Sequence, residues 1–331
     1  MILLLGATRY IGQAFARELR RRGSCFIPLS RQALDYTRFE LLFDYVRRIK
    51  PALLINAAEY SGARNADECE TVRMETFQTN TLLPQTIAQV CMMTSTPWAH
   101  VSSGAIFSGA KVFEMGEMRV EKDLNDPKVR QFFRLHKENF FGFTESDEPN
   151  FSFRCAPCSF FAGTKALAEE ALRGNPQTYI WRPNLPFGDT EHPSNLLTGV
   201  QSPGRIHDRI ASLSHVDDFV RACLDLIDRQ ASFGIYNVTN PGAVTARQIV
   251  EMVKRILKPA RGFEFWTEEE SQERGEAAAG PSCILDVTKL LSTGVRIRPV
   301  ELALEDALER WKPLAKARRS SERKMERVSA N

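Results

Sequence analysis

The chain has 331 residues, and its 44 lysines and arginines nearly balance its 41 aspartates and glutamates, for a net charge of +3. This length exceeds the usual size of one hydrophobic core and predicts a main domain with a second lobe. The charge balance disfavours a dedicated nucleic-acid surface. No apolar run approaches the roughly 20 residues of a membrane helix, and Met1 leads into a strand without a secretion signal. We therefore expect no nucleic-acid partner, no membrane partner and a cytoplasmic location.

The cysteines and histidines predict neither disulfides nor a metal site. Seven cysteines, an odd number, in a chain without a secretion signal are typical of reduced thiols. Cys155 and Cys158 form the one close pair, and no second pair or neighbouring histidine completes a redox or metal site, so we expect both to line a loop. Metal-ligand spacing is absent among the five histidines, which are His100, His136, His192, His207 and His215.

The first predicted element is the strand Ile2–Leu5, which ends at Gly6. A helix follows, with Ile11 and Leu19 on its apolar face and Gly23 where a C-cap belongs. A glycine turn between a strand and a helix N-terminus directs backbone N–H groups and the positive end of the helix dipole at a pyrophosphate. This opening therefore predicts a dinucleotide-binding site.

Strands and helices then alternate. The next predicted elements are a strand, a helix, a strand, a helix and a strand, over residues 25–29, 37–50, 53–58, 75–91 and 98–102. Thr37 and Glu40 have the spacing of a capping box, which would open the second helix. The third strand is apolar throughout, as a strand covered on both faces should be. This alternation predicts right-handed crossovers and a parallel sheet, and so an α/β fold.

Residues 108–157 interrupt the alternation with a long, charged stretch rich in phenylalanine. Its aromatic residues include Phe132, Phe133, Phe140, Phe141 and Phe143. Long insertions are usually functional or disordered, and aromatic pairs are costly to expose, so we expect a lid or a subunit contact here.

The alternation resumes with a helix, a strand and a helix over residues 164–172, 178–182 and 216–227, and a capping box at Thr245 opens a further helix. We predict a dinucleotide-binding domain over residues 1–182, which holds the insertion 108–157. Residues 183–311 would form a substrate lobe, some of whose elements return to the first domain. The basic, polar tail 312–331 is expected to be disordered.

Ten short segments carry a resemblance to a known family. They are Leu34–Thr37, Ile55–Ala58, Asn65–Glu70, Thr79–Asn80, Val101–Phe107, Glu145–Pro149, Phe161–Lys165, Trp181–Gly188, His215–Asp218 and Gly234–Val238. In this order they resemble the extended short-chain dehydrogenase/reductases of the epimerase/dehydratase superfamily, in particular the dTDP-4-dehydrorhamnose reductase branch. The resemblance spans residues 2 to about 310. It implies a Rossmann-type, doubly wound parallel sheet with a smaller C-terminal substrate lobe.

The same resemblance implies a set of catalytic positions: Ser103, Phe161 and Lys165. In such enzymes a serine or threonine hydroxyl holds the substrate oxygen, while a tyrosine and a lysine one helical turn apart exchange a proton with it and bind the nicotinamide ribose. Phe161 occupies the tyrosine position, and a phenyl ring has no proton to give. Tyr60, a water molecule or a substrate hydroxyl are the candidate substitutes.

The resemblance also implies the cofactor-binding residues. Arg9 stands where these enzymes usually carry the middle glycine, and with Arg31 it favours NADP, because a guanidinium matches a 2′-phosphate; NAD is possible. The alternative is that Arg9 obstructs the site and Arg31 is a solvated surface charge. The expected cofactor-binding set is Gly6, Thr8, Arg9, Tyr10, Ile11, Gly12, Arg31, Asp35, Tyr36, Asn56, Ala57, Ala58, Asn80 and Lys165.

These positions predict an NAD(P)-dependent oxidoreductase that acts on a keto carbon of a nucleotide-linked sugar and that could form a homodimer. Two alternatives are open. One is a dinucleotide-binding regulatory homologue that has lost the chemistry, since Phe161 and Arg9 depart from the pattern. The other is an epimerase or dehydratase, although Ala105 stands where epimerase/reductases often have a cysteine. Arg182 and Asn184 could contact the substrate or serve structural hydrogen bonds.

Overall fold

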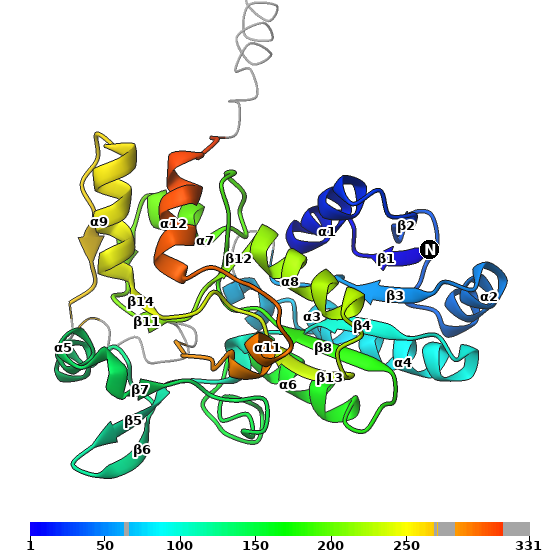
Figure 1. The fold of residues 1–331 in the computed structure, drawn as a ribbon, viewed down its shortest axis with the longest axis horizontal. Helices are drawn as coiled ribbons and strands as arrows, with labels where there is room; N and C mark the ends of the chain where they lie inside the picture. Colours follow the sequence, from blue (N-terminus) through cyan, green and yellow to red (C-terminus); the bar gives the residue numbers. More distant parts are fainter. Residues whose placement is uncertain (63–65, 268–269, 271–281, 314–331) are drawn as a thin grey trace, which may run out of the picture.

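The central feature is a six-stranded parallel sheet with strand order β13-β8-β4-β3-β1-β2, which confirms the predicted α/β Rossmann-type fold (Figure 1). The computed structural model describes residues 1–62, 66–267, 270 and 282–313. In chain order the six strands are β1 (Ile2–Leu5), β2 (Phe26–Leu29), β3 (Leu53–Asn56), β4 (Trp98–Val101), β8 (Thr178–Arg182) and β13 (Gly234–Asn237). The strand order reverses its direction at β1 and β3, and ligands of doubly wound sheets bind at such a switch point.

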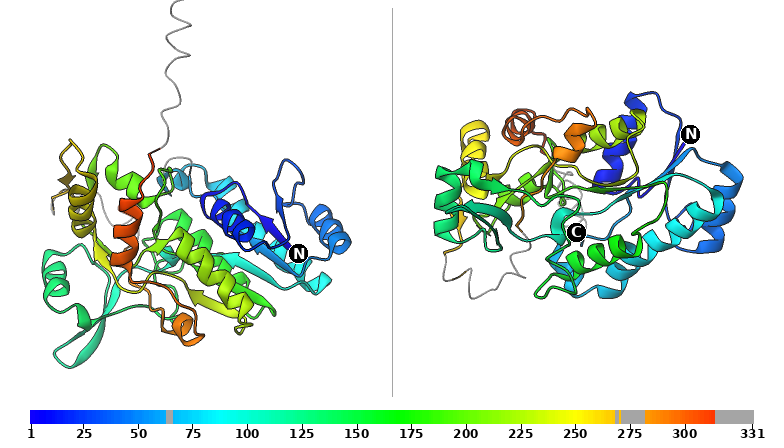
Figure 2. Two further views of the ribbon diagram at one scale, coloured as in Figure 1. Left: turned by 45° about the horizontal axis from the view of Figure 1, so that its top comes forward. Right: turned by 60° about the horizontal axis from the view of Figure 1, so that its bottom comes forward.

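Helices cover both faces of this sheet (Figure 2). The helices α1 (Tyr10–Arg21) and α8 (Val216–Asp228) pack against each other on one face, while α2 (Phe39–Ile49) and α4 (Leu83–Thr94) pack on the other. Alternate strand residues serve the two faces: Leu4 belongs to the apolar cluster with α1 and α8, and Leu3 and Leu5 belong to the cluster with α2 and α4. All four side chains of β3 are buried, which explains why its sequence shows no alternation of apolar and polar residues.

Three predicted helix boundaries are corrected. Arg38, not Thr37, is the N-cap of α2, and no side chain caps this helix, because the Thr37 hydroxyl donates to Asp35 instead. The helix predicted over residues 75–91 comprises α3 (Arg73–Phe77), a π-helical turn η2 (Gln78–Leu82) and α4. Helix α6 (Phe160–Ala171) begins four residues before the predicted start, because Ser159 caps it. The predicted capping box at Thr245 is confirmed.

The C-terminal lobe has its own apolar core, built mainly by α9 (Ala246–Leu257) and α12 (Val300–Glu309), which pack against each other. Its other elements are α7 (Leu196–Gln201), α11 (Thr288–Ser292) and the short strands β9 (Pro186–Phe187), β10 (Arg205–Ile206), β11 (Ile210–Ala211), β12 (Ser214–His215), β14 (Val244–Thr245) and β15 (Glu264–Phe265). From the same part of the sequence, α8 and β13 return to the main sheet, and α11 packs against β13 there rather than in the core of the lobe.

The insertion forms a small three-stranded sheet and a helix. They are β5 (Ala110–Glu114), β6 (Glu117–Glu121), β7 (Phe140–Phe141) and α5 (Pro127–Leu135). The remaining short helical turns are η1 (Ala66–Glu70), η3 (Gly104–Ile106) and η4 (Lys137–Asn139). In Figure 1 the β5–β6 hairpin projects from the edge of the molecule, below α5.

The predicted disordered tail lies outside the described residues from position 314 onward, as does Asn65 of the family-like segment. In the ranges that the structure describes, no helix combines the length and apolarity needed to cross a membrane.

Helix α1 is tied to α8 by charged side chains. Glu18 is buried and accepts hydrogen bonds from Arg21 and Arg22, and Arg22 also bonds Asp225 and Asp228 on α8. The hydrogen bond from Arg21 is the largest cause that lowers the pKa of Glu18, from its usual value near 4.5 to about 2. A carboxyl group with a lowered pKa stabilises the fold fully above its unfolded pKa, and this contribution is lost as the pH falls toward the folded value.

We therefore expect Glu18→Gln to lower the unfolding free energy at neutral pH, and the difference from the unmodified chain to shrink between pH 4.5 and pH 2. Urea unfolding at several pH values measures this difference. Exposed Glu40 on α2 supplies the control, since Glu40→Gln should leave the pH dependence nearly unchanged. A constant difference between Glu18→Gln and the unmodified chain across this pH range would contradict the prediction.

Candidate active site

The turn after β1 is packed too tightly for any residue but glycine. Gly6 has φ +72°, and a Cβ there would lie 2.4 Å from the backbone nitrogen of Ala58, at the end of β3. A Cβ on Gly12 would lie 2.0 Å from the carbonyl oxygen of Gly6. The two glycines therefore let the turn, helix α1 and the end of β3 meet closely, as a dinucleotide site requires.

The N-terminus of α1 fits an anion. Arg9 is its N-cap and makes no side-chain capping bond, and the first turn carries no acidic residue. The N–H of Arg9 donates to Gly6 at 2.9 Å, while the first N–H groups of a helix have no intrahelical acceptor. These donors and the helix dipole suit the pyrophosphate of a dinucleotide, and the exposed side chains of Thr8 and Arg9 leave the turn open to it.

Two predicted cations lie near Tyr36, beside the same turn. Burial is the main cause that raises the pKa of Tyr36, while the charges of Arg31 and Arg9 and a hydrogen bond with the Gly6 backbone lower it. Arg31 is exposed and lies 3.5 Å from Glu75, and Asp35 is held by Thr37. The structure thus brings Arg9 and Arg31 to the side of the turn where the resemblance implies the adenosine ribose.

Several predicted cofactor residues act as structural supports. The side chain of Tyr10 stacks on His192 of the C-terminal lobe, with ring centroids 4.5 Å apart, so its backbone is the part left for a cofactor. Ile11 is buried in the core beside the sheet, and Ala57 and Ala58 are also buried. Asn56 bonds the Ala58 N–H at 3.1 Å and the His100 ring at 3.2 Å.

Asn80 fixes the loop after β3 from the π-helical turn. It is fully buried, its side-chain oxygen accepts from the Tyr60 N–H at 2.9 Å, and its amide donates to the Tyr60 carbonyl at 2.9 Å. The same amide lies 3.4 Å from the Thr164 hydroxyl on α6. Since π-turns are rare and often occur at functional sites, this one is well placed to hold the loop against the helix that carries Lys165.

Lys165 has a carboxylate partner that the sequence did not reveal. Its side chain is fully buried, and its Nζ lies 3.1 Å from Glu59 Oε2 and 3.2 Å from the Val101 carbonyl oxygen. Glu59 retains 25% side-chain exposure, so the pair borders solvent. The ring of Phe161 lies 5.7 Å from the same ammonium, as a cation–π contact. Phe161 and Lys165 therefore lie together, as predicted, with Glu59 as the counterion.

Ser103 follows β4 at the same edge of the sheet. Its backbone is extended, and its Oγ accepts from the Ala105 N–H at 3.1 Å as the N-cap of η3. Because this bond uses an oxygen lone pair, the hydroxyl hydrogen is left to donate to a substrate oxygen. The N–H of the neighbouring Gly104 donates to Pro183 at 2.7 Å and fixes the turn that carries Ser103.

A buried ion pair supports this serine strand. Arg182 is 2% exposed and donates to Glu169 through Nε at 3.0 Å and Nη2 at 2.6 Å, and Glu169 also accepts from the hydroxyl of Ser102. The amide of Asn184 donates to the Ser212 carbonyl at 2.9 Å, also inside the protein. Arg182 and Asn184 therefore make structural hydrogen bonds within the protein. This is the alternative to the predicted contact with the substrate.

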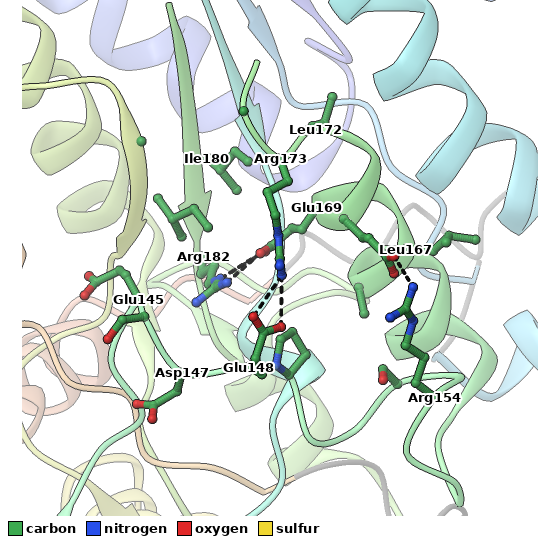
Figure 3. Close-up of a pocket in the computed structure, with 18 of the residues that line it drawn as sticks. Glu145, Asp147, Glu148, Arg154, Leu167, Glu169, Leu172, Arg173, Ile180 and Arg182 are labelled. Carbon is green, nitrogen blue, oxygen red and sulfur yellow. Dashed lines mark hydrogen bonds and ion pairs between the residues drawn. The ribbon is translucent and has the colours of Figure 1, made fainter. Parts of the chain in front are cut away.

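A cavity of about 720 Å³ lies on the other side of this ion pair, between α6, the edge strand β13 with its neighbour β8, and the loop 145–155 (Figure 3). Arg154 pairs with Glu170 of α6, and Arg173, just after α6, pairs with Glu148 at 2.9 Å, so two ion pairs join the loop to α6 and to the turn that follows it. Cys155 lines this cavity, and all seven cysteines are free, in line with the expected loop role. None of the predicted catalytic residues lines it.

Sequence reasoning missed Glu59 and Glu169. Glu169 lies one helical turn after Lys165 on a face of α6 that is otherwise buried, and this spacing could have identified it. Glu59 lies three residues after the end of β3, on the side of the sheet where ligands of parallel sheets bind, but no local pattern joins it to Lys165. Tyr60, the proposed substitute for the missing hydroxyl, is next to Glu59, and its backbone is tied to Asn80.

No group of three histidine, cysteine, aspartate or glutamate side chains within the described ranges could hold a metal ion. The expectation of a metal-free site stays a prediction.

Comparison with known families identifies the family of this chain. The family model described as the RmlD substrate binding domain matches residues 1–312. The chain belongs to this family. The match confirms the resemblance to the dTDP-4-dehydrorhamnose reductase branch that the ten sequence segments indicated.

Two relatives of this RmlD-family chain have names that include a 4-dehydrorhamnose or 4-keto-rhamnose reductase. It is 28% identical over 289 residues to the bifunctional dTDP-4-dehydrorhamnose 3,5-epimerase/dTDP-4-dehydrorhamnose reductase of Arabidopsis thaliana, covering 87% of this chain and 85% of the relative. A trifunctional UDP-glucose 4,6-dehydratase/UDP-4-keto-6-deoxy-D-glucose 3,5-epimerase/UDP-4-keto-L-rhamnose-reductase of the same plant is also 28% identical, but the match spans 87% of this chain and only 38% of that longer protein.

Solved structures confirm the fold. The L780 UDP-rhamnose synthase of Acanthamoeba polyphaga mimivirus superposes with a TM-score of 0.76 at 20% identity, over 93% of this chain and 98% of that one. The dTDP-4-dehydrorhamnose reductase of Bacillus anthracis in complex with NADP superposes with a TM-score of 0.71 at 18% identity. This match covers 94% of this chain and 97% of that one.

Proposed function

We propose that this RmlD-family chain is an NADP-dependent reductase of a nucleotide-linked 4-keto sugar. One observation carries the proposal. A tight glycine turn, Ser103 and the buried Lys165 all lie near the carboxyl ends of the parallel strands. Its named relatives are reductases and epimerases of dTDP- and UDP-linked sugars.

Each part of the site has a defined role in this proposal. The first turn of α1 binds the pyrophosphate, Arg9 and Arg31 bind the 2′-phosphate, and Lys165 binds the nicotinamide ribose. When bound, the cofactor would supply a hydride to the keto carbon. Ser103 donates a hydrogen bond to the keto oxygen, and the contact with Glu59 holds the Lys165 side chain in position inside the protein. Because Phe161 cannot donate a proton, water or a substrate hydroxyl protonates the oxygen.

The two alternatives are weaker. A regulatory homologue without chemistry is supported by Phe161 and Arg9, but Ser103 and Lys165 are both in place. Epimerisation by a thiol at position 105 is disfavoured because Ala105 has none. A cytoplasmic location, a homodimeric state and the absence of a nucleic-acid partner are part of the same proposal.

Thermal-shift titration with NADPH, NADH and nucleotide sugars tests the binding step, because selective ligand binding raises the melting temperature by mass action. We expect NADPH to bind more tightly than NADH. Loss of a charge-assisted hydrogen bond worth about 1.5–3 kcal/mol should weaken NADPH binding about 10- to 100-fold in Arg31→Ala and leave NADH binding nearly unchanged. Exposed Arg47→Ala on α2 is the control.

Oxidation of NADPH with a panel of nucleotide 4-keto sugars then separates the candidate functions. Turnover with one of them is the expected result. Binding of NADPH without turnover on any of these ketones would favour the regulatory homologue, and equal affinity for NADH would remove the role assigned to Arg31.

A further inference from the structure

Glu59 lies between the two halves of the candidate active site. The residue before it, Ala58, packs against the glycine turn, since a Cβ on Gly6 would lie 2.4 Å from the Ala58 nitrogen. The carboxylate of Glu59 lies 3.1 Å from Nζ of Lys165, on helix α6. One short stretch of the loop after β3 therefore joins the turn that suits a pyrophosphate to the lysine that the resemblance assigns to the nicotinamide ribose.

The loop holds the backbone of Glu59 in this place. On one side, the Ala58 N–H donates to the Asn56 side chain at 3.1 Å. On the other side, the N–H and the carbonyl of Tyr60 both bond the side chain of buried Asn80, each at 2.9 Å. With both neighbours tied, only the side-chain torsions of Glu59 are left to vary. A group that is held in advance loses little entropy when a ligand binds.

A dinucleotide that joins these two halves must pass Glu59. Its nicotinamide ribose is attached directly to the pyrophosphate. A ligand with the pyrophosphate at the start of α1 and the ribose at Lys165 therefore has this ribose beside the Glu59 carboxylate. The side chain of Glu59 is 25% exposed, whereas that of Lys165 is fully buried, so the carboxylate is the more accessible member of the pair.

The charged pair is complementary to the diol of a ribose. An ammonium only donates hydrogen bonds and a carboxylate only accepts them, whereas a hydroxyl does both. Lys165 donates one N–H to the Val101 carbonyl at 3.2 Å, which leaves N–H groups for Glu59 and for a ligand. The second carboxylate oxygen of Glu59, Oε1, has no hydrogen-bond partner within the ranges that the structure describes. The pair thus offers a donor and an acceptor side by side.

We propose that Glu59 is a second ligand of the nicotinamide ribose: its carboxylate accepts a hydrogen bond from one ribose hydroxyl, while Lys165 donates to the same diol. This inference rests on the proposed function, because it requires that the chain binds NADPH. It gives the carboxylate a binding role in addition to its contact with Lys165. The ammonium of Lys165 also reduces the repulsion between this carboxylate and the phosphates of the ligand, because opposite charges in contact weaken each other's field.

Isothermal titration calorimetry on the full-length protein tests the proposal with ligands that differ in this ribose. The ligands are NADPH, 2′,5′-ADP, which has no nicotinamide ribose, and an NADPH analogue whose nicotinamide ribose lacks both hydroxyl groups. We expect Glu59→Ala to bind NADPH about 10- to 100-fold more weakly, the usual loss for a hydrogen bond to a charged group. Its affinity for 2′,5′-ADP should be unchanged, which also shows that the variant is folded.

The remaining measurements separate a direct contact from an effect on Lys165. With the analogue, Glu59→Ala and the unmodified chain should bind equally, because the hydroxyl groups that Glu59 accepts from are missing. In a Lys165→Met background, Glu59→Ala should still weaken NADPH binding. Glu59→Gln keeps an acceptor oxygen and should lose less affinity than Glu59→Ala. The matched control is Glu251→Ala, at an exposed position of α9, which should bind all three ligands like the unmodified chain.

Several results would overturn the inference alone. They are an NADPH affinity of Glu59→Ala equal to that of the unmodified chain, weaker binding of 2′,5′-ADP by this variant, or no effect of Glu59→Ala in the Lys165→Met background. Tighter NADPH binding by Glu59→Ala would also overturn it, since the carboxylate would then obstruct the ribose. Absence of NADPH binding by the unmodified chain would instead refute the proposed function, and this inference with it.

Discussion

A Phe161→Tyr variant should reduce its ketone substrate about 100- to 10,000-fold faster than the unmodified chain, the usual contribution of a positioned general acid. The ring at this position already lies 5.7 Å from the buried ammonium of Lys165. A hydroxyl added to this ring would lie near a cation, and a nearby cation favours the phenolate and lowers the pKa of a tyrosine. The measurement is kcat for NADPH oxidation as a function of pH.

Phe160→Tyr is the matched control for this variant. Phe160 precedes Phe161 on α6, but its ring packs against Phe153 and the guanidinium of Arg73, away from Lys165. We expect no gain from it. An unchanged rate for Phe161→Tyr, in a folded protein that binds NADPH, would show that the missing hydroxyl does not limit turnover. The obstruction would then lie elsewhere, with Arg9 as the first candidate.

Glu169→Gln should lower the unfolding free energy by about 3–5 kcal/mol, because removal of one member of a buried ion pair leaves the other charge uncompensated. Arg182 is 2% exposed and has Glu169 as its carboxylate partner. For Ser102, next to Ser103, the substitution replaces a charged acceptor by a neutral one. Denaturant unfolding measures the loss, and a reduced kcat beside it would show that the pair also positions the serine.

Glu170→Gln provides the comparison one residue further along α6. Glu170 is exposed and pairs with Arg154 at the surface, where such a pair contributes about 0–1 kcal/mol. Replacement of both Glu169 and Arg182 by apolar residues should cost less than the single substitution, since no buried charge is left over. Equal effects of Glu169→Gln and Glu170→Gln would show that the buried pair does not stabilise the fold.

Much of the site could be predicted because its parts are local. The turn at Gly6 and Gly12, the serine after β4 and the spacing of Phe161 and Lys165 are short patterns, and each occurs where a strand or helix begins or ends. The capping box of α9 was predicted for the same reason. The capping box predicted for α2 does not form, because the Thr37 hydroxyl donates to Asp35 instead. A capping pattern shows that a side chain could cap the helix. Whether the capping bond forms depends on the other acceptors within reach of that side chain.

The sequence by itself determined the parallel sheet and the glycine turn after β1, since apolar strands alternating with amphipathic helices have few other ways to bury their surfaces. Only the tertiary structure decided which side chains meet across those elements. Glu59 reaches Lys165, and Arg182 reaches Glu169, because crossovers bring separate strand ends and α6 together. The small sheet of the insertion likewise depends on the register of β5 with β6 and β7, which alternation in a single strand does not specify.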